Sequence, residues 1–286
     1  MIAQNENKLI TSFLLWLDHE ILSKGQAFTN ISGNFFPQTT YFNNYYTYGS
    51  PFAQFVYDNS ISGATIATGV YLNNVPIVTG QSGFLGINSD RGHAIFGINQ
   101  NNYVISGYFA IKDFNIMLTY DSEETLLFKT KYQLRPKSPQ TATGICQDCR
   151  AYPIIYVRED GGYNAPFALG GTDQANYDIR CVILADSLFK LNAVQGILRN
   201  SVNKLIPLFD ISEQPFNALG ILKSGHFNYT GLAQNKINNH NYVYIEKVKI
   251  PKRSQSYTVD SKLLNSDIFF NFVDFEVSQI GDFRSC

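Results

Sequence analysis

The side chains that could hold a metal ion or carry out redox chemistry are four cysteines and four histidines. Cys146 and Cys149 form a C-x-x-C pair, the spacing of half a zinc site or of a redox dithiol. No second half of a zinc site follows, because Cys181 lies in an expected strand, and His226 and His240 are farther apart than the usual spacing of roughly three to five residues. A redox dithiol would open a helix after a strand, which the surrounding sequence does not predict. We therefore expect free thiols, no metal and no cofactor, with a metal at Cys146 and Cys149 as the alternative.

No local arrangement typical of a catalytic site is present. The motifs G-x-S-x-G and H-E-x-x-H are absent, and neither His19 nor His93 has a nucleophile or carboxylate at a triad-like spacing. The pairs Gly161-Gly162 and Gly170-Gly171 do not complete a phosphate-binding loop, so we interpret them as turn glycines. A triad of distant residues leaves no local pattern. Even so, these observations favour a protein that has no catalytic residues and is not an enzyme.

Charge gives little support for nucleic-acid binding. The formal net charge is −1, and phosphate contacts need clustered lysine and arginine. The nearest approach to a basic patch is formed by Lys247, Lys249, Lys252 and Arg253. Lysines on an edge strand block unwanted pairing, which is the simpler interpretation. In a ring they would instead face an acidic neighbour or a nucleic-acid channel.

Composition favours β-structure with many loops. Only 16% of the residues are charged, against roughly 25% in an average soluble domain, and 14% are aromatic, a class that favours strands. Protein–protein interfaces share this richness in aromatics and poverty in charge, although codon bias in an AT-rich genome would give the same composition. No stretch of about twenty apolar residues predicts a membrane span, and the N-terminus lacks the basic region of a signal peptide. We therefore expect folding in a cytoplasm.

The segment from Phe28 to Phe55 is dense in aromatic residues and asparagine. It is too polar for a helix, which indicates an ordered loop or arm whose rings lie either on the core or on a neighbouring copy. We predict that residues 35–57 reach across to a neighbour and fold fully only on assembly. The candidate interface residues are Phe35, Phe36, Tyr41, Phe42, Tyr45, Tyr46, Tyr48, Phe52 and Phe55.

Periodicity predicts an amphipathic helix over residues 5–24, with apolar side chains at i, i+3, i+4 and i+7. A hairpin is expected over 70–78, where Asn73-Asn74 forms the turn and Pro76 marks an edge strand. Further strands are expected at 84–87, 93–98 and 103–106, then a longer pair at 109–120 and 125–132, and then a linker at 134–143.

The C-terminal half is expected to form strand, strand, helix, strand and strand. The helix begins after Asp186 or Ser187 and is stopped by Pro207, with apolar positions at Leu191, Val194, Leu198, Val202 and Leu205. The strands are expected at 152–157, 177–184, 243–250 and 269–280, with a Gly-rich loop at 164–173.

These elements predict an α+β fold. It would be mostly antiparallel β-sheet with an N-terminal amphipathic helix and one further long helix packed on the sheet, plus a β-rich inserted region. Residues 1–28 and 145–286 would form the α+β core, and residues 29–144 the β-rich region with the aromatic, Asn-rich arm.

Several segments resemble virion structural proteins of tailed bacteriophages. They are Ser62-Gly-Ala-Thr, Gly69-Val-Tyr-Leu-Asn-Asn, Gly80-Gln-Ser-Gly-Phe, Asp90-Arg-Gly-His-Ala-Ile-Phe, Lys112-Asp-Phe-Asn-Ile-Met-Leu-Thr and Ile179-Arg-Cys-Val-Ile-Leu-Ala-Asp-Ser. The order of elements in the C-terminal half is also similar to that of tail-terminator and neck proteins, which assemble as rings at the head–tail junction. The β-rich region departs from that pattern, so the neck, the tail terminator, the baseplate and a capsid decoration all stay open as positions.

The resemblance implies a structural component of a phage virion. It would be a neck or tail-terminator (head–tail connector) protein that forms a six- or twelve-fold homo-oligomeric ring through strand and arm contacts. Its partners would be further copies and other neck and tail proteins, with DNA passing without sequence-specific contact and no membrane involved. It would assemble in the host cytoplasm and reside in the virion. The alternative is a carbohydrate- or receptor-binding β module on a virion or cell surface, because aromatic rings also stack on sugars.

Overall fold

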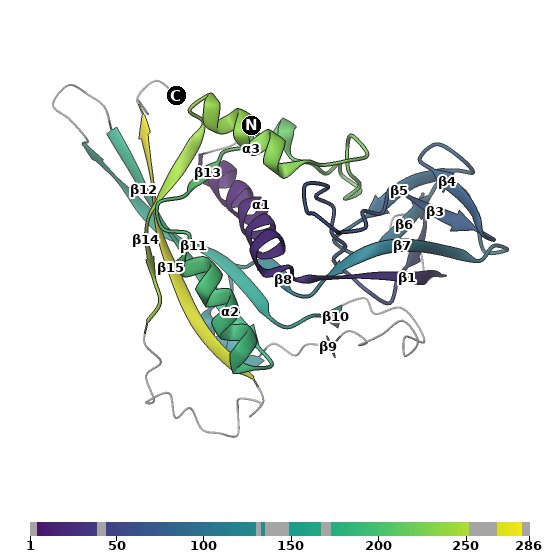
Figure 1. Cartoon of the computed structure of the whole chain (residues 1–286), viewed down its shortest axis with the longest axis horizontal. Coiled ribbons are helices and arrows are strands. Elements are labelled where there is room, and N and C mark those ends of the chain that lie inside the picture. Colours follow the sequence, from purple (N-terminus) through teal and green to yellow (C-terminus); the bar gives the residue numbers. More distant parts are fainter. Residues whose placement is uncertain are drawn as a thin grey trace.

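The chain folds into an α+β structure built on two sheets of mostly antiparallel strands (Figure 1). The computed structural model describes residues 5–38, 44–129, 133–134, 149–166, 173–251 and 268–281. The N-terminal half contains α1 (Asn5–Gly25), β1 (Phe28–Pro37), β2 (Tyr46–Gly49), β3 (Gly69–Leu72), β4 (Val75–Val78), β5 (Phe84–Asn88), β6 (His93–Phe96), β7 (Ile105–Lys112), β8 (Asn115–Leu118) and the π-helical turn η1 (Thr125–Lys129). The remainder contains β9 (Gln133–Leu134), β10 (Cys149–Arg150), β11 (Ile154–Pro166), β12 (Asp173–Ala185), α2 (Leu188–Arg199), β13 (Leu205–Pro207), the 3-10 turn η3 (Ile211–Glu213), α3 (Tyr229–Asn238), β14 (Tyr242–Lys249) and β15 (Phe269–Gly281).

The first sheet has seven strands in the order β4-β3-β7-β1-β2-β6-β5. Strand β1 is shared by its two halves, since it pairs with β7 over residues 28–35 and with β2 at its last two residues. The edge strands β4 and β5 meet through the turn between them, where the Gly80 N–H donates to the Phe84 carbonyl. The sheet therefore curls into a near-barrel. Its core is aromatic, with the Phe55 and Phe109 rings stacked at 4.0 Å.

The second sheet has six strands in the order β13-β14-β15-β12-β11-β8. Its centre is formed by β11, β12 and β15, each 13 residues long. All neighbours are antiparallel except β8, which joins β11 in parallel. The chain thus leaves the near-barrel after β7 and enters this sheet at β8, only two residues later.

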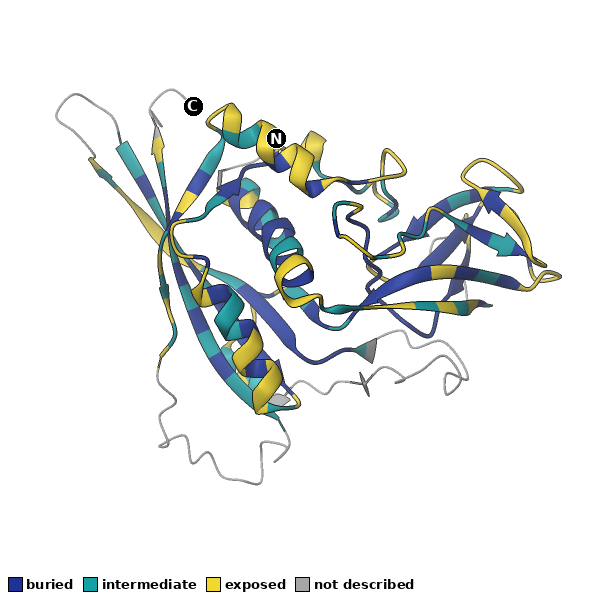
Figure 2. Ribbon diagram, in the orientation of Figure 1, coloured by how far each residue is buried: buried dark blue, intermediate teal, exposed yellow. Residues whose placement is uncertain are grey.

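Helices α1 and α2 cover one face of the six-stranded sheet (Figures 1 and 2). Phe13 of α1 meets Phe275 of β15 edge to face at 5.2 Å, and Trp16 packs beside both. The Ser187 side chain caps α2 by accepting a hydrogen bond from the Lys190 N–H. On the opposite face, part of the sheet is covered by η1, whose Leu126 lies in a second apolar cluster with Tyr152, Ile154, Tyr156, Val182 and Leu184.

Several expectations from the sequence are confirmed. The first helix spans the predicted residues. The hairpin turns at Asn73 and Asn74, with φ of 47° and 69°, and Pro76 lies on the edge strand β4. The predicted mixed character of β15 is also found, because its odd-numbered residues from Val273 to Val277 are buried under the helices.

Other expectations are wrong. Residues 109–120 and 125–132 do not form a pair, since β7 ends at Lys112, β8 joins the other sheet and Thr125–Lys129 is helical. Local alternation cannot show which sheet a strand joins, and the two residues between β7 and β8 redirect the chain.

The second helix is shorter than predicted. It ends at Arg199 with Asn200 as its C-cap, and Asn203 adopts a positive φ of 66°. Val202 therefore lies outside the helix, and Leu205 belongs to β13. Helix α3 was not predicted. The loop expected at 164–173 is shorter, because β11 continues to Pro166 and β12 begins at Asp173. The predicted linker at 134–143 lies outside the described residues, apart from Leu134 in β9.

The structure also places β8 (Asn115–Leu118), from the predicted β-rich region 29–144, in the sheet of the predicted core. The seven-stranded near-barrel itself is confined to Phe28–Lys112. The change of sheet thus falls between Lys112 and Asn115.

The contact between α1 and the sheet predicts a stability effect. Phe13→Ala should lower the free energy of unfolding by about 3–5 kcal/mol, because a fully buried ring is lost and a cavity remains. Phe189→Ala is the matched control, since that helical phenylalanine is 82% exposed and its loss should change stability by no more than about 0.5 kcal/mol. Urea unfolding followed by circular dichroism measures both, and equal losses would contradict the packing described.

Candidate functional site

The nine aromatic residues predicted at an interface fall into three groups. Phe35, Tyr48, Phe52 and Phe55 are buried in the near-barrel of their own chain. The sequence left open whether these rings lie on the core or on a neighbour, and for these four the structure places them on the core. Phe36 and Tyr45 are half-buried and Tyr46 is exposed, so an interface through them stays a prediction. Tyr41 and Phe42 lie outside the described residues.

The predicted arm is largely part of the near-barrel. Within residues 35–57, Phe36 and Pro37 of β1 pair with β2, all four residues of β2 pair with β6, and Phe55 forms a bridge to Ile111 of β7. The Tyr48 hydroxyl accepts a hydrogen bond from the Gln100 N–H at 2.7 Å. This segment therefore contributes to the fold of its own chain.

The described residues do not form a metal-binding cluster. Cys181 is buried in β12, and burial raises the pKa of its thiol. Cys149 begins β10, while Cys146 and Cys286 lie outside the described residues, so the C-x-x-C alternative stays untested. Within the described ranges, no three His, Cys, Asp or Glu side chains are close enough to hold a metal ion. No helix in that part of the chain is long and apolar enough to cross a membrane.

A hydrogen bond between His19 and Asp58 ties α1 to the start of α3. His19 Nδ1 lies 2.8 Å from Asp58 Oδ2, and the His19 ring stacks on Tyr229 at 4.5 Å. Asp58 Oδ1 accepts hydrogen bonds from the Ser60 N–H and hydroxyl and from the Tyr229 N–H. Burial opposes ionisation of this carboxyl, but the hydrogen bonds outweigh it and lower its pKa. Because the Ser60 hydroxyl donates to the carboxylate and not to the imidazole, the group lacks the order of a nucleophilic triad.

An ion pair is buried where α1 meets the near-barrel. Lys112 Nζ lies 2.7 Å from Asp18 Oδ1 and 4.4 Å from the centre of the Tyr57 ring, which forms a cation–π contact. Burial and the nearby Asp18 carboxylate raise the pKa of Tyr57. Beside the pair lies a pocket of about 390 Å³, at whose wall Gln54 adopts a positive φ of 62°. The pair joins α1 to β7 and thereby fixes the near-barrel against the helical layer.

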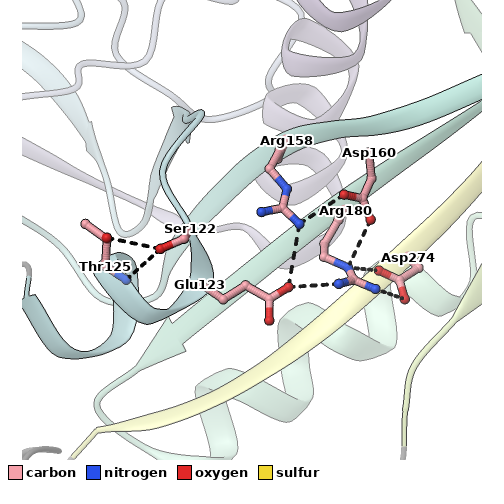
Figure 3. A network of polar contacts seen from close by, with 7 residues as sticks. All are labelled: Ser122, Glu123, Thr125, Arg158, Asp160, Arg180 and Asp274. Carbon is pink, nitrogen blue, oxygen red and sulfur yellow. Dashed lines mark hydrogen bonds and ion pairs between the residues drawn. The ribbon is translucent and has the colours of Figure 1, made fainter.

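Two arginines and three carboxylates form a network on the outer face of the six-stranded sheet (Figure 3). Arg180 binds Asp274 through two nitrogens, at 2.7 and 3.2 Å, and Glu123 at 2.8 Å. Hydrogen bonding to Asp274 is the main reason that the pKa of Arg180 is raised. Arg158 binds Asp160 at 3.0 Å and lies 3.7 Å from Glu123. Because Glu123 precedes η1, the network fastens that turn to β11, β12 and β15.

In one section of the six-stranded sheet, the strands at both edges, β11 and β14, have no neighbouring strand on their outer side in the part of the chain that the structure describes. Among the described residues, nothing pairs with β11 beyond Val157 on the side away from β12, or with β14 beyond Ile245 on the side away from β15. Two rows of paired residues bound the open section, Arg158–Arg180–Asp274–Lys249 and Gly162–Tyr177–Val277–Ile245. The four strands of this section alternate in direction, so another copy of β11 placed beside β14 would run antiparallel to it.

Both open edges carry charged side chains on the outer face of the sheet, an arginine and an aspartate on β11 and two lysines on β14. At the β11 edge, the outer face carries exposed Asp160 and half-buried Arg158, whereas Glu159 pairs with Ile179 and lies on the face toward the helices. At the β14 edge, Lys247 and Lys249 bind Glu276 of β15 and remain largely exposed.

Strand register places Arg180, Glu276 and the two lysines on the outer face. Asp160 lies in the bulge and is placed on that face by its contacts with Arg158 and Arg180. From the sequence, the preferred interpretation of these lysines is an edge strand that blocks unwanted pairing, with an acidic neighbour or a nucleic-acid channel as the alternatives. Nothing in the sequence indicates that Asp160 lies at the level of Lys247.

The distal half of the β11–β12 hairpin projects from the body of the protein (Figures 1 and 2). The first four residues of β11 are buried, whereas those from Asp160 to Asn164 are exposed. Gly161 has a φ of 110° and lies in a bulge between Glu159 and Gly162. The pair Gly161-Gly162 thus lies inside strand β11 and not in the turn expected from the sequence, and Gly161 alone of the two adopts a positive φ. The exposed ribbon is thus accessible to another chain.

No family model matches this chain, and the comparisons with curated proteins and with solved structures found no match either.

Burial of His93 in the near-barrel predicts a pH dependence. Burial, helped by the nearby Arg91, lowers the pKa of His93 to about 4, whereas an unfolded histidine titrates near 6.5. Between these values the unfolded chain binds the additional proton, so the free energy of unfolding should fall by roughly 3 kcal/mol as pH drops from about 6.5 to 4, and then level off. A His93→Asn variant should lose most of this slope in urea unfolding across that range. An unchanged slope in the variant would assign the dependence to other groups.

The buried ion pair between Asp18 and Lys112 predicts that the effects of mutating its two residues on the free energy of unfolding are not additive. Asp18→Leu leaves the Lys112 ammonium buried without its carboxylate and should cost about 3–5 kcal/mol of stability. The double variant Asp18→Leu/Lys112→Met removes both charges and should be more stable than the single variant. Chemical unfolding of the four proteins in the cycle measures the coupling. Additive losses would show that the two charges do not depend on one another.

Proposed function

We propose that this protein is a structural subunit that assembles head to tail, β14 of one copy pairing with β11 of the next. The open section of the six-stranded sheet is the observation that carries this proposal. Unpaired N–H and C=O groups on an exposed edge are a template for another strand. Because the two edges belong to different strands, the contact is heterologous, and such contacts close into a ring when the rotation per copy allows it.

Charge supports the pairing of these two edges over the pairing of either edge with itself. In a head-to-tail contact at this level, Lys247 faces the bulge that carries Asp160, while Lys249 lies level with Arg158, whose charge Asp160 and Glu123 balance. Two β14 edges would place lysines opposite lysines, and like charges directly opposite are destabilising. The low charge and high aromatic content of the chain agree with a protein that buries surface in an assembly.

The resemblance in sequence supports the setting of this assembly. We propose that the protein belongs to a tailed-phage virion, where its preferred location is a neck or tail-terminator ring at the head–tail junction. In that setting its neighbours are other neck and tail proteins, and DNA passes without sequence-specific contact. A ring of six or twelve copies, put together in the host cytoplasm, is the expected product.

Cross-linking tests the head-to-tail contact. Asp160→Cys and Lys247→Cys are introduced, singly and together, into a chain whose Cys146, Cys149 and Cys286 are changed to serine. A short bismaleimide should join the double variant into a ladder that ends at the ring, and a mixture of the two single variants should stop at dimers. Light scattering on the unmodified protein gives the mass of the assembly.

The single variants are the controls for symmetry. Under the proposal, neither alone yields cross-linked dimers, because residue 160 does not face residue 160 and residue 247 does not face residue 247. Dimers from one single variant would indicate an isologous interface. A monomeric mass together with no cross-linking in the double variant would overturn the proposed self-assembly.

A further inference from the structure

An open groove of about 590 Å³ lies on the outer face of the near-barrel, over β1, β3 and β7. Its polar and aromatic lining consists of Ser32, Asn34, Tyr71, Asn74, Ser106 and Tyr108. The strand register places most of these side chains on one face, because Ser32 pairs with Tyr108, and Ser106 pairs with both Asn34 and Tyr71. Asn74 comes from the tip of the β3–β4 hairpin. None of these residues belongs to the six-stranded sheet or to its open edges.

Two glycines form the floor of the groove. A Cβ at Gly33 would lie 3.4 Å from the Phe109 ring, and one at Gly107 would lie 3.1 Å from the Phe35 ring. The glycines therefore let two core rings press against the inner side of the backbone. The floor of the groove is therefore backbone that rests on the aromatic core. Most of the side chains that line the groove come from the residues next to the two glycines.

The two tyrosines stand at a right angle to one another. Their ring centres are 5.6 Å apart and the rings are inclined by 82°, while Tyr108 is 59% exposed. One ring thus offers a flat face and the other a wall, each with a hydroxyl at its end. An aromatic face is electron-rich and attracts C–H groups of slight positive charge, such as those on one face of a pyranose ring.

The lining also selects against charged ligands. Within the described lining of the groove there is no lysine, arginine, aspartate or glutamate. Phosphate and carboxylate groups would find no cationic partner here, whereas neutral hydroxyl groups match amide and hydroxyl side chains, which both donate and accept hydrogen bonds. A few convergent polar groups beside an apolar surface are the usual makeup of a small-molecule site.

We propose that this groove binds a neutral carbohydrate. One sugar ring stacks on Tyr108 against the wall formed by Tyr71, and its hydroxyl groups bond to Asn34, Asn74 and the two serines. The groove is open to solvent and has a volume of about 590 Å³, so the proposal extends to an oligosaccharide. This gives an assembling subunit a separate surface for a glycan, and it does not depend on the head-to-tail contact.

The experiment is a screen of the full chain against an array of neutral and acidic oligosaccharides, followed by calorimetry with the best neutral ligand. Tyr108→Ala should weaken binding about tenfold or more, because the stacking contact is lost. Tyr108→Phe keeps the ring and should retain most of the affinity. Tyr120→Ala is the matched control, since Tyr120 is 82% exposed and lies outside the groove, and it should bind as the unmodified protein does.

Three outcomes would overturn the proposal. They are no binding to any neutral oligosaccharide, binding to acidic glycans alone, and equal affinities of Tyr108→Ala and Tyr120→Ala. Light scattering on Tyr108→Ala separates this proposal from the assembly. An unchanged mass with lost glycan binding supports the groove, whereas a changed mass with glycan binding retained would make Tyr108 an assembly contact.

Discussion

The arrangement of both sheets depends on the burial of α1 between them. The helix packs Phe13 and Trp16 onto the six-stranded sheet, while Asp18 on the same helix binds Lys112 at the end of the near-barrel. The apolar stripe of α1 alone would fix only the contact between the helix and the six-stranded sheet. Because a buried ammonium group without a partner is costly, the ion pair makes the position of the near-barrel as specific as that of the sheet. The adjacent His19–Asp58 pair extends the same control to α3.

This rigid junction has consequences for both proposed surfaces. The chain passes from β7 to β8 with only two residues between, and β1 follows α1 just as closely. Two short connections and a buried ion pair hold the groove over β1, β3 and β7 at a set position relative to the open edges. In a ring every copy would therefore present its groove at the same place. Repeated weak sites on one assembly bind a multivalent target more tightly than a single site does.

Much of the local structure could be predicted from the sequence, because it is set by neighbours in the chain. The first helix follows from apolar spacing, the Asn73-Asn74 hairpin from turn chemistry and the start of α2 from its serine cap. The predictions were wrong where contacts between distant residues determine the structure. Val202 continues the apolar repeat of α2, but the left-handed backbone at Asn203 shows that the chain has already turned toward β13.

The candidate sites were harder to predict for the same reason. Three strands lie between Tyr71 and Tyr108 in the sequence, and only the pairing of β3 with β7 brings their rings together. The aromatic residues at 35–55 drew attention because they are close in sequence, yet four of them serve the core. A sequence rich in aromatic residues indicates that these rings are buried, but it does not show whether they face the core of their own chain or a neighbouring chain. That information comes from the register between paired strands, which depends on residues far apart in the sequence and cannot be read from a local segment.

The features that protect the open edges also favour one specific partner. Both edge strands carry a bulge in the open section, β11 between Glu159 and Gly162, and β14 between Ile245 and Lys247. Bulges and charges at an edge discourage indiscriminate pairing, because a flat strand of another protein does not match the added twist or the charge. A second copy of this chain presents a bulged strand with Asp160 at the level of Lys247. The same devices that keep the free subunit from aggregating would therefore restrict pairing to the β14–β11 contact, and this is the selectivity that a closed ring requires.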